Sequence, residues 1–333
     1  MKKILPTVET DHLIVGAGVA GITLARRMFD KKLNFLVAEK ATSVGGRLAT
    51  RRDQKTKFDH GAQFLKCKID ASAVSNQWPE MGRLRTWFHQ AGADYKYSEG
   101  GMNSLAKISV ESFSEKILLN HRIHCLTAKR DLDGYYLAKT DDGIAISAKH
   151  IYLTCPLPQS LNILTESSIQ FPQELERIHY AKALVGLYVI RQSEMTPKDT
   201  ATLMNFKFME KVSDEIFSIA NQTSKGLSED LAFTLVMKPE WSEKNYDTEE
   251  SLTLQMMTNL FLNSIEQLVS VRLPVDSVDR CQLKKWRYAH PLHHSDLLHK
   301  SVQPGLILLG DAFGGASIHG ALRSAESIPL SLI

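Results

Sequence analysis

The chain has 333 residues, of which 43% are apolar and 23% are charged, a composition that excludes a disordered, collagen-like or disulfide-stapled protein. Its length predicts two domains, or one large domain with a second lobe. Forty basic residues against 37 acidic ones leave a net charge of +3, and the basic residues are scattered. We expect neither a nucleic-acid nor a membrane partner, because such binding needs a clustered basic face.

The cysteines and the N-terminus indicate a reducing compartment. The four cysteines form no short Cys/His ligand pattern, so we expect neither a structural zinc site nor a disulfide framework. The first apolar stretch is only Ile4 and Leu5, too short for a secretory signal. No segment approaches the ~20 apolar residues of a membrane span, and we therefore expect a cytoplasmic protein. The cysteines are Cys67, Cys125, Cys155 and Cys281.

The strongest local signal lies in the first forty residues. The apolar run 12–15 predicts a buried strand, and a GxGxxG pattern formed by Gly16, Gly18 and Gly21 leads from it into a helical pattern. In such a unit the first glycine permits a tight turn, the second lets the backbone approach a pyrophosphate, and the third lets helix and strand pack closely. The free N–H groups at the helix start attract phosphates.

A carboxylate at the end of the next strand strengthens this prediction. The apolar run 35–38 ends at Glu39, 23 positions after Gly16. A carboxylate in this position can accept hydrogen bonds from both ribose hydroxyls of an adenosine. The alternative, a glycine-rich turn that binds nothing, does not explain the carboxylate. The sequence therefore predicts a dinucleotide site.

Later segments indicate which dinucleotide is bound. Residues 45–52 read GGRLATRR, residues 58–64 read FDHGAQF, and a buried strand ends at Gly310 and Asp311 before a helical segment from Gly320. Together these segments resemble the FAD-dependent amine oxidase superfamily. The resemblance implies an α/β fold with a Rossmann-like FAD-binding domain of the GR2 or amine oxidase type, and a second α+β substrate domain built on a mixed or antiparallel sheet.

The resemblance also implies a noncovalent FAD and a set of residues that bind it. Arg47 would supply a cation along the pyrophosphate, Asp311 would approach the ribityl chain, and the last helix would point its positive end at the flavin N1 and C2 carbonyl. The monoamine oxidases attach FAD through a C-terminal cysteine, whereas the last cysteine here, Cys281, precedes the Gly310–Asp311 strand end. The implied cofactor-binding residues are Gly16, Gly18, Ala20, Gly21, Glu39, Lys40, Gly46, Arg47, His60, Gly61, Ala62, Gln63, Gly310, Asp311, Gly320 and Ala321.

Within the superfamily, residues 45–52, 58–64 and 285–291 look like motifs of the renalases. This likeness implies NAD(P)-related substrates: isomeric dihydronicotinamides would pass hydride to flavin N5, and O2 would reoxidise the flavin to give hydrogen peroxide. A flavin amine oxidase or desaturase acting on an amine or a hydrocarbon is the alternative. A non-catalytic binding protein is a third possibility, because Rab GDP-dissociation inhibitors use the same fold without a flavin.

Four residues are candidates for catalysis. Trp286 and Tyr288 are two apart on a predicted strand and share a face, where their rings could stack on a planar substrate, although core packing would explain them equally well. His60 and His319 lie inside motifs expected beside the flavin. The histidines near the C-terminus lack acidic or thiolate neighbours at ligand spacing, and no metal site is predicted. These histidines are His290, His293, His294 and His299.

The rest of the chain predicts a strand-rich second lobe. Helices are predicted over 108–118 and from a capping box at 247–250 to about residue 269. An Asp133-Gly134 turn is predicted to join two strands of a small antiparallel meander. Strands are predicted at 182–191, 214–220 and 231–237. We assign residues 1–65, 101–165 and 283–333 to a discontinuous FAD-binding domain, and residues 66–100 and 166–282 to the substrate domain.

Overall fold

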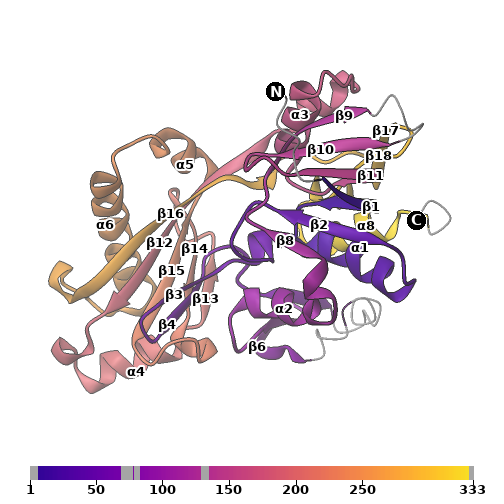
Figure 1. Cartoon of the computed structure of the whole chain (residues 1–333). Coiled ribbons are helices and arrows are strands. Elements are labelled where there is room, and N and C mark those ends of the chain that lie inside the picture. The colour runs from indigo at the N-terminus through magenta and orange to yellow at the C-terminus, as the bar shows by residue number, and fades with distance from the viewer. Residues whose placement is uncertain (1–6, 69–77, 79–82, 129–134, 330–333) are drawn as a thin grey trace.

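The computed structural model describes residues 7–68, 78, 83–128 and 135–329 of the chain. The turn expected at Asp133-Gly134 lies outside these residues. Figure 1 shows two sheets side by side, each with its own helices. In the described part, no helix combines the length and the apolarity that a membrane crossing requires.

Eight α-helices and eighteen strands are described, besides short 3₁₀ turns. The helices are α1 (Val19–Asp30), α2 (Met102–Ser109), α3 (Leu157–Glu166), α4 (Pro197–Asn205), α5 (Pro239–Asn245), α6 (Glu250–Val269), α7 (Asp311–Gly314) and α8 (Ile318–Glu326). The strands of the first half are β1 (Thr7–Val15), β2 (Phe35–Glu39), β3 (Thr50–Asp53), β4 (Thr56–Asp59), β5 (Leu65–Lys68), β6 (Arg85–Gln90), β7 (Ala93–Tyr97), β8 (Ile117–Leu119), β9 (Ile123–Ala128), β10 (Tyr136–Thr140) and β11 (Ala145–Leu153). Those of the second half are β12 (Tyr180–Ile190), β13 (Phe208–Glu210), β14 (Ile216–Asn221), β15 (Leu231–Met237), β16 (Val278–Pro291), β17 (His299–Gln303) and β18 (Leu306–Leu309).

The first sheet has eight strands and a parallel centre. Strands β18, β11, β1, β2 and β8 lie side by side in parallel, while β17 pairs antiparallel with β18 at one edge. Strands β10 and β9 continue from β11 as an antiparallel extension. The chain thus returns to this sheet from its two ends and its middle, so the domain is assembled from separate stretches of sequence.

Continuous apolar runs form the centre of this sheet because both of its faces are buried. Ile14 packs on one face with α1, α2 and α8, while its neighbours Leu13 and Val15 pack on the other face with α3. Alternate residues of β11 and β18 divide between the two cores in the same way. The sheet is therefore the middle layer of three, as an α/β domain requires.

The second sheet has five antiparallel strands in the order β13, β14, β15, β12, β16. One face packs on α4 and α6 around Tyr188, Phe233 and Phe261. The opposite face carries a smaller apolar group that includes Val185 and Phe58 of β4. Because only one face is covered by helices, the other is available to build a wall toward the first domain. The predicted fold class, an α/β domain with a second sheet-based domain, is confirmed.

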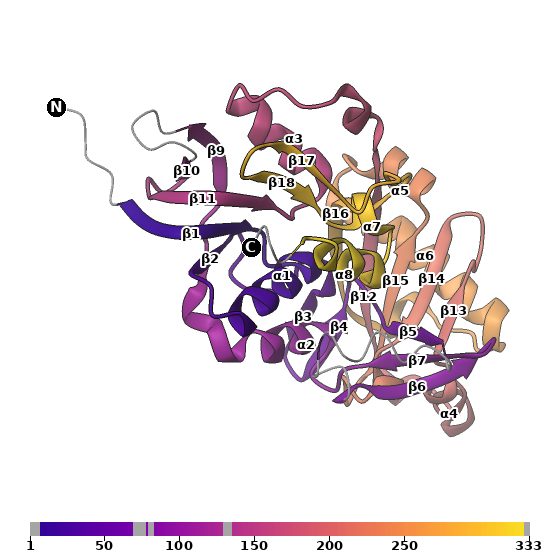
Figure 2. The same cartoon turned by 90° about the vertical axis from the view of Figure 1, so that its right-hand side faces the viewer.

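Two small sheets accompany the larger ones. Strands β3 and β4 form a ribbon, and β5, β7 and β6 form a three-stranded sheet that lies beside β13 in Figure 2. Phe64 and Phe88 contact Phe208 across this boundary. The residue limits that we assign to the two domains stay a prediction.

The strands expected at 182–191, 214–220 and 231–237 are present as β12, β14 and β15, and the helix expected to reach residue 269 is α6. The helix expected over 108–118 is wrong beyond Ser109, where α2 ends. There the chain forms a 3₁₀ turn and then β8, because Ile117–Leu119 pairs with the edge of β2. Pairing with an existing sheet edge overrides the helical pattern of the sequence.

Gly21 should be required for folding of the first domain. A Cβ at Gly21 would lie 2.0 Å from the carbonyl oxygen of Gly16, whereas a Cβ at Gly18 would meet nothing within 4 Å. We expect Gly21→Ala to lower the free energy of unfolding by about 1–3 kcal/mol, the usual cost of overpacking. Gly18→Ala is the matched control and should cost less than about 1 kcal/mol. Chemical denaturation measures both, and equal losses would contradict the packing role.

Candidate cofactor and active site

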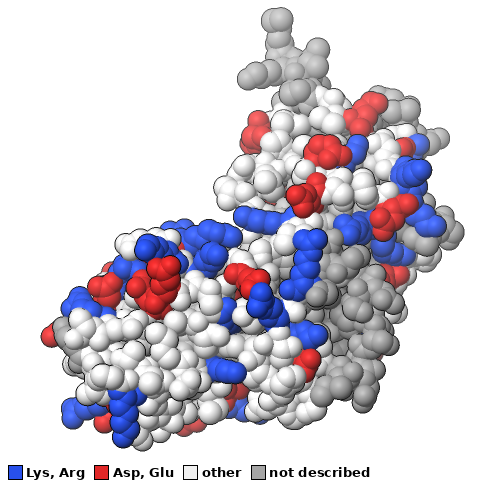
Figure 3. Space-filling model, turned by 90° about the horizontal axis from the view of Figure 1, so that it is seen from below, with Lys and Arg blue, Asp and Glu red and all other residues white. Residues whose placement is uncertain are grey.

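A cavity of about 1120 Å³ lies between the two sheets. Its wall begins at the carboxyl ends of β1 and β2 and extends to β12, β15 and β16 of the five-stranded sheet. Ligands of open α/β sheets bind at this carboxyl edge. Basic and acidic side chains are interspersed on the face of the molecule shown in Figure 3, in keeping with the small net charge.

The glycine-rich turn forms one end of the cavity, where Gly16, Gly18 and Ala20 line the wall. Gly18 precedes the first residue of α1, and no side chain caps this helix. The position of a Cβ on Gly46 would lie 3.3 Å from the Cα of Gly18, so the two glycine segments approach closely. Free N–H groups and bare backbone together form a cradle suited to phosphates.

Glu39 lies in the same end of the cavity, at the last position of β2. Its Oε2 accepts a hydrogen bond from the N–H of Ala17 at 2.7 Å, and its Oε1 accepts one from the N–H of Ala41 at 2.8 Å. A carboxylate offers about four acceptor positions, so acceptors remain for ribose hydroxyls. The neighbouring Lys40 also lines the cavity, and its Nζ donates to Gln159 Oε1.

A bidentate ion pair forms the middle of the wall. Arg47 Nη1 and Nη2 lie 2.5 and 2.8 Å from the Asp311 carboxylate oxygens, and the Tyr180 hydroxyl donates to Asp311 Oδ1 at 2.9 Å. Burial lowers the pKa of Arg47, but Asp311 and Tyr180 raise it, and the net change is upward. Gly46, Gly310 and Ala321 line the cavity around this pair. Its two charges balance each other, so little net charge remains here.

The far end of the cavity is aromatic and apolar. His60, Gly61, Ala62, Trp286 and Tyr288 all line it. The Trp286 ring stacks on the His60 ring with centroids 5.4 Å apart, and its Nε1 donates to the His60 carbonyl oxygen at 2.8 Å. The predicted strand that carries Trp286 and Tyr288 is β16, and both residues lie beside the cavity.

His60 is uncharged near neutral pH. Burial lowers its pKa to about 4, and the cations of Lys284 and Arg51 act in the same direction. Its Nδ1 is buried and has no hydrogen-bond partner among the described residues. A polar atom left unpaired in this way costs free energy unless a ligand satisfies it.

Four of the predicted site residues do not line the cavity. They are Gly21, Gln63, His319 and Gly320. Gly21 and Gly320 are packing positions, since a Cβ on Gly320 would meet the carbonyl oxygen of Gly315 at 2.0 Å. Gln63 is buried, and its side chain bonds to other buried polar groups. His319 is in the first turn of α8, where Ile318 rather than His319 lines the cavity.

Sequence reasoning missed two polar residues of this region. Tyr180 completes the Arg47–Asp311 pair, and Lys225 is buried behind the segment 60–62. No local pattern marks either residue, because each acts through contacts more than a hundred positions away. Among the residues that the structure describes, no group of three or more His, Cys, Asp or Glu side chains is placed to hold a metal ion.

Comparison with known proteins identifies the family. Residues 14–76 match the model of an NAD(P)-binding Rossmann-like domain, and residues 83–327 match that of the flavin containing amine oxidoreductases. The second match covers more than half of the chain. The protein belongs to the flavin containing amine oxidoreductase family. It is thus a member of an oxidoreductase family, and membership implies FAD as cofactor and a small-molecule substrate.

Individual relatives are distant. A 58-residue stretch is 38% identical to amine oxidase B of Bos taurus and of Homo sapiens, which is 17% of this chain and only 11% of those enzymes. The structure is similar to that of a candidate protoporphyrinogen oxidase from Exiguobacterium sp. 255-15, with a TM-score of 0.69, 14% identity and 97% of each chain covered. Putrescine oxidase with bound putrescine has a TM-score of 0.68 at 14% identity, with 96% of this chain and 98% of that chain covered. At such identities the likeness shows the fold alone.

The residues present fit FAD. The cavity is slightly larger than the usual range of about 300–1,000 Å³ for small-molecule sites, which suits a long dinucleotide. It joins a glycine cradle suited to phosphates and the Glu39 carboxylate at one end to an aromatic wall with an unpaired His60 Nδ1 at the other. Both the donor set and the size of the cavity therefore match the cofactor of the family.

Replacing Glu39 should weaken FAD binding through the adenosine. Glu39→Ala removes acceptors for two ribose hydroxyls, and charge-assisted hydrogen bonds are worth roughly 1.5–3 kcal/mol each. We expect the FAD dissociation constant of the apoprotein to rise at least about tenfold. FMN lacks the adenosine, so its affinity should be similar in both proteins. Flavin fluorescence titration measures both ligands, and an unchanged FAD constant would place Glu39 away from the ribose.

Proposed function

We propose that this protein binds FAD noncovalently and oxidises a small nitrogen-containing substrate by removing hydride from one of its carbon atoms. The observation that carries the proposal is a single cavity with a dinucleotide-binding end at Glu39 and a substrate wall at Trp286. Bound FAD supplies the two-electron acceptor, and molecular oxygen would then take the electrons and become hydrogen peroxide.

The positions of the cysteines support a noncovalent cofactor. Cys155 is the one cysteine among the four that lines the cavity, and it lies near Glu39 and Lys40, at the adenosine end. Burial raises the pKa of this thiol, and its Sγ lies 3.1 Å from Ser160 Oγ. No cysteine of the described residues lines the wall beside Trp286.

The chain's own side chains bind and orient the substrate at the far end. Val185 and Val236 of the five-stranded sheet add an apolar surface beside Trp286, which excludes water and favours a flat or apolar reacting group. The neutral His60 offers an unpaired Nδ1 in the same wall. Holding the reacting carbon in one orientation is the main contribution that such a wall makes to the rate.

Two substrate classes remain, each favoured by a separate observation. Family membership and the putrescine oxidase fold favour an amine. The charges of the cavity favour a renalase-like reaction with an isomeric dihydronicotinamide, whose phosphates are anionic. Among the described residues that line the cavity, Glu39 and Asp311 are the acidic ones, and both already have partners. The cations include Arg287, which lines an adjoining pocket of about 490 Å³ together with Asp247. Lys182 lines both as well, but its Nζ already lies 2.8 Å from Glu243 Oε1.

Anaerobic stopped-flow absorbance decides between these classes. Isomeric dihydronicotinamides should bleach the visible flavin band much faster than benzylamine or a polyamine, because a planar ring gains stacking and orientation against Trp286. Trp286→Ala should slow this bleaching about tenfold. Trp286→Phe keeps a ring but loses the hydrogen bond to His60, so it should retain most of the rate.

The opposite result assigns the substrate to the other class. Rapid bleaching by an amine, with no reaction of any dihydronicotinamide isomer, would reject the renalase-like activity and leave an amine oxidase. Readmitting air and assaying hydrogen peroxide tests the role of oxygen in either case. A purified protein that binds no flavin would reject the proposal as a whole.

A further inference from the structure

A fully buried lysine lies behind the substrate end of the cavity. Lys225 ends a short 3₁₀ turn (Thr223–Lys225) after β14, and the side chains of Lys225 and Asp59 are both 0% exposed. A buried ammonium is costly unless a counterion and hydrogen bonds satisfy it. Neither the ribose site nor the substrate wall uses this lysine, so its place in the fold needs a different reason.

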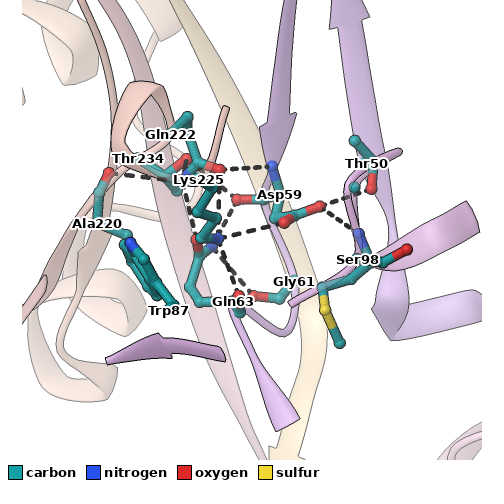
Figure 4. A network of polar contacts seen from close by, with 12 residues as sticks. Thr50, Asp59, Gly61, Gln63, Trp87, Ser98, Ala220, Gln222, Lys225 and Thr234 are labelled. Atoms are coloured by element: carbon teal, nitrogen blue, oxygen red, sulfur yellow. Dashed lines mark hydrogen bonds and ion pairs between the residues drawn. The ribbon is translucent and has the colours of Figure 1, made fainter. Parts of the chain in front are cut away.

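The acceptors of Lys225 lie at both ends of one cavity segment. Its Nζ is 3.2 Å from Asp59 Oδ2, 2.8 Å from the carbonyl oxygen of Gln63 and 3.0 Å from Gln63 Oε1. Figure 4 shows the ammonium directed between these two residues, with the Trp87 ring on its other side. Residues 60–62, which lie between Asp59 and Gln63 in sequence, line the cavity.

Asp59 also accepts hydrogen bonds from several neighbouring elements. Its Oδ1 accepts from Thr50 Oγ1 at 2.6 Å and from the N–H of Met102 at 2.7 Å. Its carbonyl oxygen accepts from Thr234 Oγ1 on β15 at 3.0 Å. Elements of the first domain bond to the Asp59 carboxylate and β15 bonds to its backbone carbonyl oxygen, so the first domain and the five-stranded sheet meet at this one residue, and Lys225 supplies the balancing charge.

We propose that Lys225 is a positioning residue for the flavin-ring end of the cofactor site, because it fixes both ends of the wall segment 60–62 from the substrate-side sheet. The inference rests on the proposed function in one respect: it requires the adenosine of FAD at Glu39 and the flavin ring beside His60. Lys225 then sets the place of His60, Gly61 and Ala62, while the phosphate cradle at Gly18 is independent of it.

Two ligands separate this role from general stabilisation. ADP contains the adenosine and the phosphates but no flavin ring, so it probes only the Glu39 end. In apoprotein titrations, Lys225→Met should raise the FAD dissociation constant about tenfold or more and leave that of ADP within about twofold. Fluorescence quenching measures FAD, and calorimetry measures ADP.

Lys225→Met leaves the Asp59 carboxylate buried without its counterion and could unfold the protein. The double variant D59N/K225M has no unpaired buried charge, so it should regain stability while the preferential loss of FAD affinity persists. Ser242→Ala is the matched control. Ser242 is buried on α5, and its Oγ accepts from the N–H of Leu184 at 3.0 Å without contacting residues 59–63. It should lower stability and leave the ratio of FAD to ADP affinity unchanged.

The outcomes of this experiment are distinct. Unchanged FAD affinity in both Lys225 variants, or equal losses for FAD and ADP, would overturn the positioning role while leaving the proposed function intact. Failure of the wild-type apoprotein to bind either ligand would reject the proposed function itself.

Discussion

The arrangement of the cavity depends on the bidentate ion pair between Arg47 and Asp311. These residues lie 264 positions apart, one after the second glycine segment and the other at the start of α7, which follows β18. The Asp311 side chain is 8% exposed, and the guanidinium allows it to be buried at low cost because both parallel hydrogen bonds are made. Tyr180 of the five-stranded sheet donates to the same carboxylate. One contact therefore joins the dinucleotide-binding sheet, the C-terminal strand and the substrate wall.

The Arg47–Asp311 ion pair also determines which groups of the cavity are available to bind a charged ligand. Because Arg47 and Asp311 balance each other, the backbone N–H groups at the start of α1 are the clearest partners for phosphates. The substrate end offers apolar and aromatic surface, with Arg287 and the Glu243-paired Lys182 at its border. Under the proposed function, a planar or apolar reacting group fits such a wall better than a free cation does. Family membership alone does not make this distinction, since its members share a fold and a cofactor rather than one substrate.

The dinucleotide-binding motif could be predicted from the sequence because its residues are brought together by short-range structure. Gly16, Gly18 and Gly21 lie within one turn and one helix start, and Glu39 ends the very next strand, so spacing alone places them together. The role of Lys225 could not be predicted from the sequence, because its acceptors on Asp59 and Gln63 lie more than 160 positions earlier in the chain. The same limit explains the misplaced helix before β8, where pairing with β2 decides the structure. Residues that connect the two domains therefore cannot be identified from sequence patterns that describe a single helix, strand or turn.

The central claim is that one noncovalent FAD spans the cavity from Glu39 to Trp286. Acid precipitation of the purified protein, followed by absorbance and chromatography of the supernatant, tests it most directly. The account predicts a yellow protein whose flavin is released into the supernatant as FAD, at about one per chain. A yellow pellet would show a covalent link, and a protein that binds no flavin even after incubation with FAD would contradict the account of the cavity.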